Sequence, residues 1–84
     1  MPLYFFDTRD NERYIEDDQG VEVRDLEAVK VLAAESLTEL ARDVIPGSVR
    51  QELAVEVRDG GGPVLRTILH FEAVILRPML KPVS

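Results

Sequence analysis

The spacing of apolar residues differs from one segment of the chain to the next, and the spacing in each segment predicts a helix or a strand. Residues 3–6 are apolar throughout, which predicts a buried strand, and a polar turn then leads to a short second strand at 13–16. Residues 51–58 alternate between apolar and polar, which predicts a half-buried strand. A glycine-rich turn at 59–63 leads into a fourth strand, which we expect to run from 64 to about 76.

The longest predicted element is an amphipathic helix between the two pairs of strands. Six apolar residues recur at spacings of three and four, on one narrow helix face: Leu26, Val29, Ala33, Leu37, Leu40 and Val44. Asp25 is a favoured N-cap residue, and Glu27 lies in the first turn, where the helix dipole stabilises a carboxylate. Pro46 and Gly47 predict the end of the helix. We therefore expect a helix of about five turns over 25–44.

The elements follow one another in the order ββαββ, which predicts an α+β fold. Two hairpins, one on each side of the helix, predict an antiparallel sheet of about four strands with the helix packed on one face. The 84 residues correspond to a single domain, which we place at 1–76. Residues 77–84 contain two prolines and are expected to form an extended tail. The pattern leaves the strand order open.

Apolar residues occupy both sides of the predicted sheet, although one helix covers only one side. A domain of this size buries only about 60% of its unfolded surface, and association can supply further stabilisation. We therefore predict a homodimer, formed by packing of open faces or by pairing of edge strands. Alternatively, the tail or loops cover the open face. The predicted dimer face consists of Tyr4, Phe6, Val64, Ile68, Val74 and Leu76.

The net charge of −6 lies entirely in the first third of the chain. Residues 1–28 contain nine acidic and three basic residues, whereas 29–84 contain seven of each. An acidic surface repels phosphate backbones, which argues against a nucleic-acid partner. The surface is either simply solvated or faces a basic partner protein. The predicted acidic interaction face consists of Asp10, Glu12, Glu16, Asp17 and Asp18.

Residues with catalytic or metal-binding chemistry do not form a recognisable motif. The acidic run Glu16–Asp18 lacks the ligand spacing of a calcium loop. His70 is the single histidine, and no serine lies in a nucleophile context. The turn Asp59–Pro63 lacks the lysine and the following helix of a phosphate-binding loop. We therefore assign no catalytic, cofactor-binding or metal-binding residue and expect no enzymatic activity.

The location expected from composition is the cytoplasm. The chain has no cysteine, so disulfides and thiolate metal sites are excluded. No apolar run reaches the roughly 18 residues that a membrane span needs. The first ten residues also lack the basic start and apolar core of a signal peptide.

Three motifs resemble the start of a family of short uncharacterised alphaproteobacterial proteins. They are a Pro-x-Tyr-Phe-Phe strand at 2–6, an Asp-x-x-Gly segment at 17–20 and an Asp-Leu-Glu-Ala helix opening at 25–28. Residues 55–71 resemble the closing hairpin of that family. Its function is unknown, so the resemblance implies no site residue. Typical members often have histidine where Asp7 stands here.

The order of elements in the first half is also similar to that of HicB-like antitoxins. That resemblance implies a toxin-neutralising regulator that binds a basic partner, although no DNA-binding element follows here. Our first interpretation is a non-enzymatic, acidic protein-interaction module that acts as a homodimer. The alternatives are an antitoxin-type regulator and a small metal-dependent hydrolase built on Glu16, Asp18 and His70.

Overall fold

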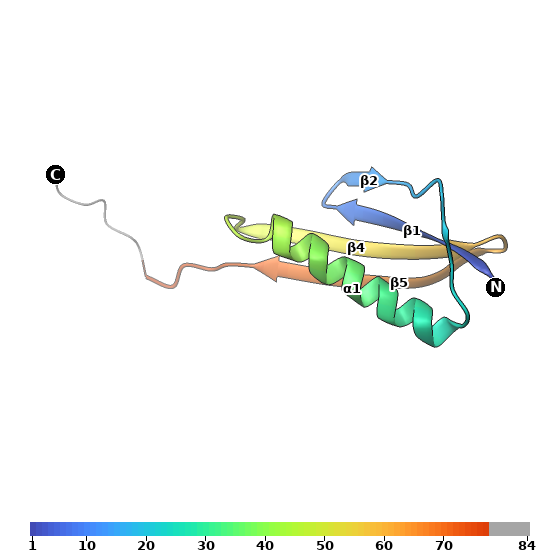
Figure 1. Ribbon diagram of the computed structural model, residues 1–84. Coiled ribbons are helices and arrows are strands. Elements are labelled where there is room, and N and C mark those ends of the chain that lie inside the picture. Colours follow the sequence, from blue (N-terminus) through green and yellow to red (C-terminus); the bar gives the residue numbers. More distant parts are fainter. Residues whose placement is uncertain (78–84) are drawn as a thin grey trace.

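A single helix lies across one face of an antiparallel sheet in the computed structural model, which describes residues 1–77 (Figure 1). The strands are β1 (Leu3–Asp10), β2 (Arg13–Ile15), β3 (Val21–Glu22), β4 (Arg50–Asp59) and β5 (Gly62–Glu72), and the helix α1 spans Leu26–Val44. The strand order is β2-β1-β4-β5, and β3 also pairs with β1. The predicted α+β class and ββαββ order are therefore confirmed, with β3 as an additional strand of two residues.

The ends of α1 lie close to the predicted positions. The side chain of Asp25 is the N-cap and accepts a hydrogen bond from the backbone N–H of Ala28 at 2.8 Å. At the other end, Ile45 N–H donates to the carbonyl of Ala41, and Gly47 follows with a φ of +89°. The capping residues and the proline thus set the length of the helix as their chemistry predicts.

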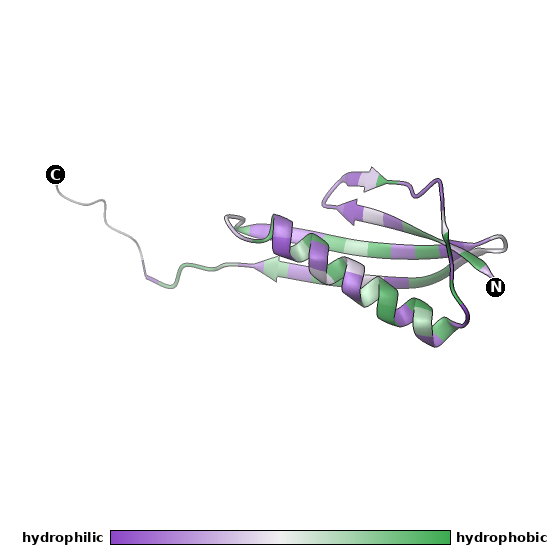
Figure 2. Ribbon diagram, in the orientation of Figure 1, coloured by the Kyte–Doolittle hydropathy of each residue, from purple (hydrophilic) through white to green (hydrophobic). Residues whose placement is uncertain are grey.

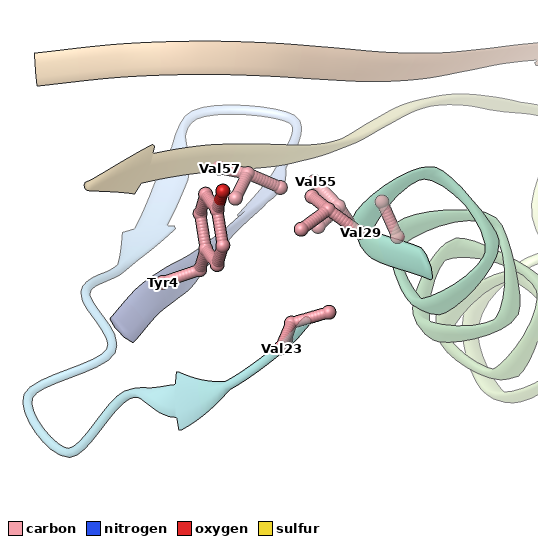
Figure 3. Packing of buried hydrophobic residues seen from close by; sticks show 6 residues of the cluster. Tyr4, Val23, Val29, Val55 and Val57 are labelled. Carbon is pink, nitrogen blue, oxygen red and sulfur yellow. The ribbon is translucent and has the colours of Figure 1, made fainter. Parts of the chain in front are cut away.

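The core lies between α1 and strands β4 and β5, which the helix crosses (Figure 1). Val29 and Ala33 of α1 are fully buried against Val55 and Val57 of β4. Figure 3 shows Tyr4 of β1 pointing into the same cluster. The hydropathy colouring shows polar and apolar residues alternating along β4, which fits a strand with one face against the helix and the other face open (Figure 2).

The predicted dimer face does not exist as one surface. Phe6 pairs with Val57, so the even-numbered side chains of β1 point toward the helix. Tyr4 is accordingly a core residue, and Phe6 packs against the core, as does Val64 of β5. Ile68 lies on the opposite, open face. Val74 and Leu76 follow the end of β5, so the six residues occupy three different places.

The fourth predicted strand was expected to reach 76, but β5 ends at Glu72. The reason is the length of its neighbour: Glu72 pairs with Arg50, the first residue of β4, and one further bond joins Ala73 N–H to the Val49 carbonyl. Beyond it the chain is exposed up to Arg77 and bends at Leu76 and Arg77. The rest of the predicted tail at 77–84 lies outside the described residues.

Candidate interaction surface

The densest acidic stretch of the sequence lies where the outer edge of β1 is interrupted. β2 pairs with one half of β1 and β3 with the other, and residues 16–20 connect them. In the gap, the Asp17 carboxylate accepts the backbone N–H of Phe6 at 3.0 Å. Its other oxygen accepts the N–H groups of Gln19 and Gly20 at 3.0 and 3.2 Å. The Asp17 carboxylate therefore accepts the hydrogen bond that a neighbouring strand would otherwise accept from β1. Because the carboxylate is used within the fold, Asp17 does not belong to the predicted interaction face.

Asp17 belongs to a larger polar network with Asp7 and Arg58. Asp7 is almost completely buried, with 3% of its side chain exposed, and accepts Asp17 N–H at 2.9 Å. The Arg58 guanidinium donates to Asp7 at 2.9 Å and to the Asp17 carbonyl at 2.9 Å. It also lies 4.5 Å above the centre of the Phe5 ring, a cation–π contact. We call these three residues the Asp7–Asp17–Arg58 network.

The network holds its carboxylates in the charged form. Burial acts to raise the pKa of Asp7, but the hydrogen bonds from Asp17 N–H and Arg58 outweigh it, and the pKa lies below its ordinary value. Burial likewise acts to raise the pKa of Asp17, and three backbone N–H donors together with Arg58 lower it. Burial and the nearby Asp7 carboxylate raise the pKa of the Tyr14 phenol. Hydrogen bonds within the fold thus hold each of these carboxylates, and the network joins β1, β4 and the 16–20 connection.

Gly20 closes the Asp-x-x-Gly segment for two independent reasons. Its φ of +78° lies in the left-handed region, and a Cβ there would stand 3.0 Å from Phe5 Cε1 and 3.1 Å from Leu3 Cδ1. We expect Gly20→Ala to lower the free energy of unfolding by about 2 kcal/mol, from backbone strain plus crowding. Gly47→Ala is the matched control, because its φ is +89° with nothing within 4 Å. Urea denaturation should show the smaller loss at Gly47, and equal losses would contradict the crowding.

A shallow pocket of about 370 Å³ on the open face adjoins the network, with Tyr14, Arg58 and Arg66 in its lining. Its charged groups already have partners, since Arg58 pairs with Asp7 and Arg66 with Glu56 at 3.1 Å. No buried side-chain polar atom within residues 1–77 lacks a hydrogen-bond partner. The two arginines that line the pocket are therefore already paired within the fold.

Rows of alternating charge cover the open face of the sheet, which the sequence had predicted to be partly apolar. Glu56 bridges Arg9 and Arg66 at 3.6 and 3.1 Å. Nearer the other end of the strands, His70 lies 3.6 Å from Glu52 and Arg50 lies 2.9 Å from Glu72. Ile68, 62% exposed, stands among these polar groups. This face is solvated, and a dimer formed by packing two apolar open faces is unsupported.

Carboxylates gather instead along the edge that β2 and β3 make. Residues 10–23 contain six acidic residues and one basic residue, a net charge of −5. Four exposed side chains there have no ion-pair partner among the described residues, and we call them the acidic edge: Glu12, Glu16, Asp18 and Glu22. Asp10, also predicted for this surface, accepts a hydrogen bond from Gln51 at 2.7 Å and is partly buried.

The residues proposed for a hydrolase do not meet. Glu16 and Asp18 lie beside β1 at one edge of the sheet, whereas His70 lies on β5 at the opposite edge. In the described part of the chain, no three histidine, cysteine or acidic side chains could hold a metal ion together. No helix in residues 1–77 is long and apolar enough to cross a membrane.

Sequence reasoning missed the partnership of Asp7 with Arg58. The two residues are 51 positions apart, and only the register of β1 with β4 brings them together. One signal was present: aspartate is depleted in strands, yet Asp7 directly continues an apolar strand. An aspartate in such a place needs a paired cation.

Comparison with known families identifies a domain family that covers most of the chain. A family model described as a domain of unknown function (DUF6894) matches residues 3–71. No curated protein and no solved structure matches the chain. The matched range contains every strand except the last residue of β5, the whole helix and the Asp7–Asp17–Arg58 network.

Proposed function

Since the chain belongs to the DUF6894 family, whose function is unknown, we propose from its own surfaces that it is a non-enzymatic protein-interaction module. In this proposal the module acts as a homodimer and binds a basic protein through its acidic edge. The observation that carries the proposal is the contrast between the two sets of charges. Charges on the open face are paired with one another, whereas those of the acidic edge point to solvent without an ion-pair partner in the first 77 residues.

An electrostatic interface of this kind has a characteristic dependence on salt. Exposed charges attract a basic partner over about 8 Å at physiological ionic strength and over much less at 1 M salt. Complementary charge raises the rate of association more than it slows dissociation. Binding should therefore weaken gradually as charges are removed or salt is added, without an all-or-none loss.

Neutralising three of the four acidic-edge residues is expected to weaken capture of the partner. The triple variant Glu12→Gln, Glu16→Gln, Asp18→Asn removes three exposed charges and no hydrogen bond of the fold. The measurement is affinity capture from the native cell at low and at high salt, followed by mass spectrometry and by titration of the purified partner. We expect the affinity to fall by at least about tenfold, given roughly 0.5–1 kcal/mol per exposed charge contact.

A second triple variant controls for net charge alone. Glu35→Gln, Glu39→Gln and Asp43→Asn remove three exposed charges from the helix. This control should bind like the wild-type protein. Equal weakening by the two triple variants, or no specific partner at low salt, would contradict the proposed role of the acidic edge.

The proposal includes a source and a location. An alphaproteobacterial source is supported by the Pro-x-Tyr-Phe-Phe and Asp-Leu-Glu-Ala motifs. A cytoplasmic location is supported by the absence of cysteine, because small domains of oxidising compartments commonly rely on disulfides.

A further inference from the structure

The outer edge of β5 presents an unpaired hydrogen-bonding ladder. β5 is 11 residues long, and no strand within residues 1–77 pairs with the edge that faces away from β4. Ala73 N–H bonds to the Val49 carbonyl, so odd-numbered residues of this segment direct their backbone groups toward β4. The intervening residues Arg66, Ile68, His70 and Glu72 therefore direct their N–H and C=O groups outward. An exposed edge of this length is a ready template for another strand.

The two edges of the sheet differ in how they are protected. Along β1, the outer partners are strands of three and two residues, and the Asp17 carboxylate occupies Phe6 N–H between them. Short edge strands and interruptions are the usual means of blocking further pairing. β5 has neither feature along residues 65–72, because its one register shift, at Val64, lies near the start of the strand. The unprotected edge is therefore the one suited to a partner strand.

We propose that two copies of the chain pair β5 with β5, antiparallel, about a two-fold axis at Leu69. This inference rests on the proposed homodimer and gives it a geometry. The pairing places Ile68 opposite the partner's His70 and Arg66 opposite the partner's Glu72. Both pairs join residues whose backbone groups point outward, so each makes two hydrogen bonds across the interface. In an isologous contact every such pair occurs twice.

The charged residues of β5 favour this pairing register over the registers shifted to either side. With the axis at Leu69, each Arg66 faces an opposite charge, whereas an axis at Ile68 or at His70 would place Arg66 against His70 or Val74. Within one chain Arg66 already contacts Glu56, and Glu72 contacts Arg50. The interface would join these pairs into one alternating row across both chains. Opposite charges directly across an antiparallel pair stabilise it, and like charges destabilise it.

The same register gives a partner to the apolar segment after β5. Val74, Ile75 and Leu76 are 66, 70 and 93% exposed and extend past the start of β4. About an axis at Leu69, Val74 and Ile75 reach the start of the partner's β5, where its register shifts at Val64. Three exposed apolar residues in succession are an unfavourable surface for a monomer. In the dimer they continue the ladder along the partner's β5.

Charge reversal tests the register directly. Arg66→Glu and Glu72→Arg each place two like-charge contacts across the interface, one on each side of the axis. Each variant alone should therefore show a dimer dissociation constant raised roughly tenfold. An equal mixture of the two variants makes both contacts attractive again. We expect the mixture to form heterodimers with an affinity within about threefold of the wild-type dimer. Sedimentation velocity of the full chain from about 1 to 200 μM measures all three samples.

Arg9→Glu is the matched control, because Arg9 contacts the same Glu56 carboxylate as Arg66 but lies on β1, away from the interface. It should leave the dissociation constant unchanged. A wild-type chain that stays monomeric to 200 μM would overturn both the homodimer and this interface. The proposed interface would be wrong if neither charge reversal weakened the dimer, or if mixing the two variants did not restore the affinity. Either result would still be compatible with a homodimer.

A cysteine at the axis gives a second measurement. Leu69 faces itself across the two-fold axis in a non-hydrogen-bonded pair, where Cα atoms are about 4.5 Å apart, within the range of a disulfide. The chain has no native cysteine, so a single Leu69→Cys change reports on that contact alone. Oxidation should cross-link Leu69→Cys much faster than Ile68→Cys. Equal rates at the two positions would overturn the register.

Discussion

Replacing Asp7 with alanine is expected to lower the free energy of unfolding by about 3 kcal/mol. The change removes the acceptor of Asp17 N–H and of two guanidinium nitrogens of Arg58. Asp7 is buried at the centre of the network, so water cannot easily replace it there. For a small domain with a total stability of the order of 5 kcal/mol, such a loss approaches unfolding at 37 °C.

The measurement is urea denaturation followed by circular dichroism, with two comparison variants. Glu52→Ala removes an exposed carboxylate on the same sheet face, whose one ion pair within residues 1–77 is with His70, and should change stability by less than about 0.5 kcal/mol. Asp7→Asn keeps one acceptor oxygen and should lose less than Asp7→Ala. A loss at Asp7 no larger than at Glu52 would show that the network does not hold β1 and β4 together.

The pH dependence of stability gives an independent readout of the same network. The pKa values of Asp7 and Asp17 are lowered in the folded protein, whereas an unfolded aspartate titrates near about 3.9. The network's contribution is therefore complete above about pH 4 and declines as the pH falls through the folded-state pKa values. Asp7→Asn should reduce this acid-induced loss of stability, because one of the two shifted groups is gone.

Replacing Asp17 with alanine should cost about 2–3 kcal/mol, the second largest effect that we expect. Phe6, Gln19 and Gly20 would each lose the acceptor of a backbone N–H, and the connection from β2 to β3 would lose its anchor on β1. The adjacent Asp18 is the control, because it is exposed and accepts no hydrogen bond within residues 1–77. Asp18→Ala should change stability by less than about 0.5 kcal/mol.

Thermal unfolding of the two neighbouring variants decides whether the acidic run has two distinct roles. Asp17→Ala should also increase amide exchange at Phe6, which a loss of surface charge alone would not do. Similar melting temperatures for the two variants would contradict the structural role of Asp17. In that case all three carboxylates of residues 16–18 would belong to the solvent-exposed acidic surface.

Local chemistry was sufficient to predict the helix and both hairpins. The spacing of apolar residues in 26–44, the Asp25 cap and the Pro46-Gly47 end each act within one or two turns of the chain. The turn at 59–63 likewise follows from glycine, and Gly61 N–H bonds to the Asp59 carboxylate. These predictions were confirmed because each depends on neighbours in the sequence.

Predictions that depend on distant residues were less successful. The two sides of β1 carry similar apolar residues, so the pattern could not say which side faces the helix; the pairing of Phe6 with Val57 decides it. The end of β5 depends on where β4 begins, some 20 residues earlier in the chain. The role of Asp17 depends on Phe6 N–H, which is free only because β2 and β3 leave a gap. In each case the cause is the pairing register, which is a tertiary property.

The position of Asp17 beside Phe6 also bears on the size that an assembly of this protein can reach. Two copies joined along β5, as proposed, would present at each outer end a β1 edge interrupted by a carboxylate that already occupies the free N–H. A third copy would find no continuous ladder there and would meet like charges. Association should therefore stop at a closed pair instead of polymerising into a fibre. The pair would be bivalent, with one acidic edge at each end of a single sheet, so two basic partners could bind without competing for space.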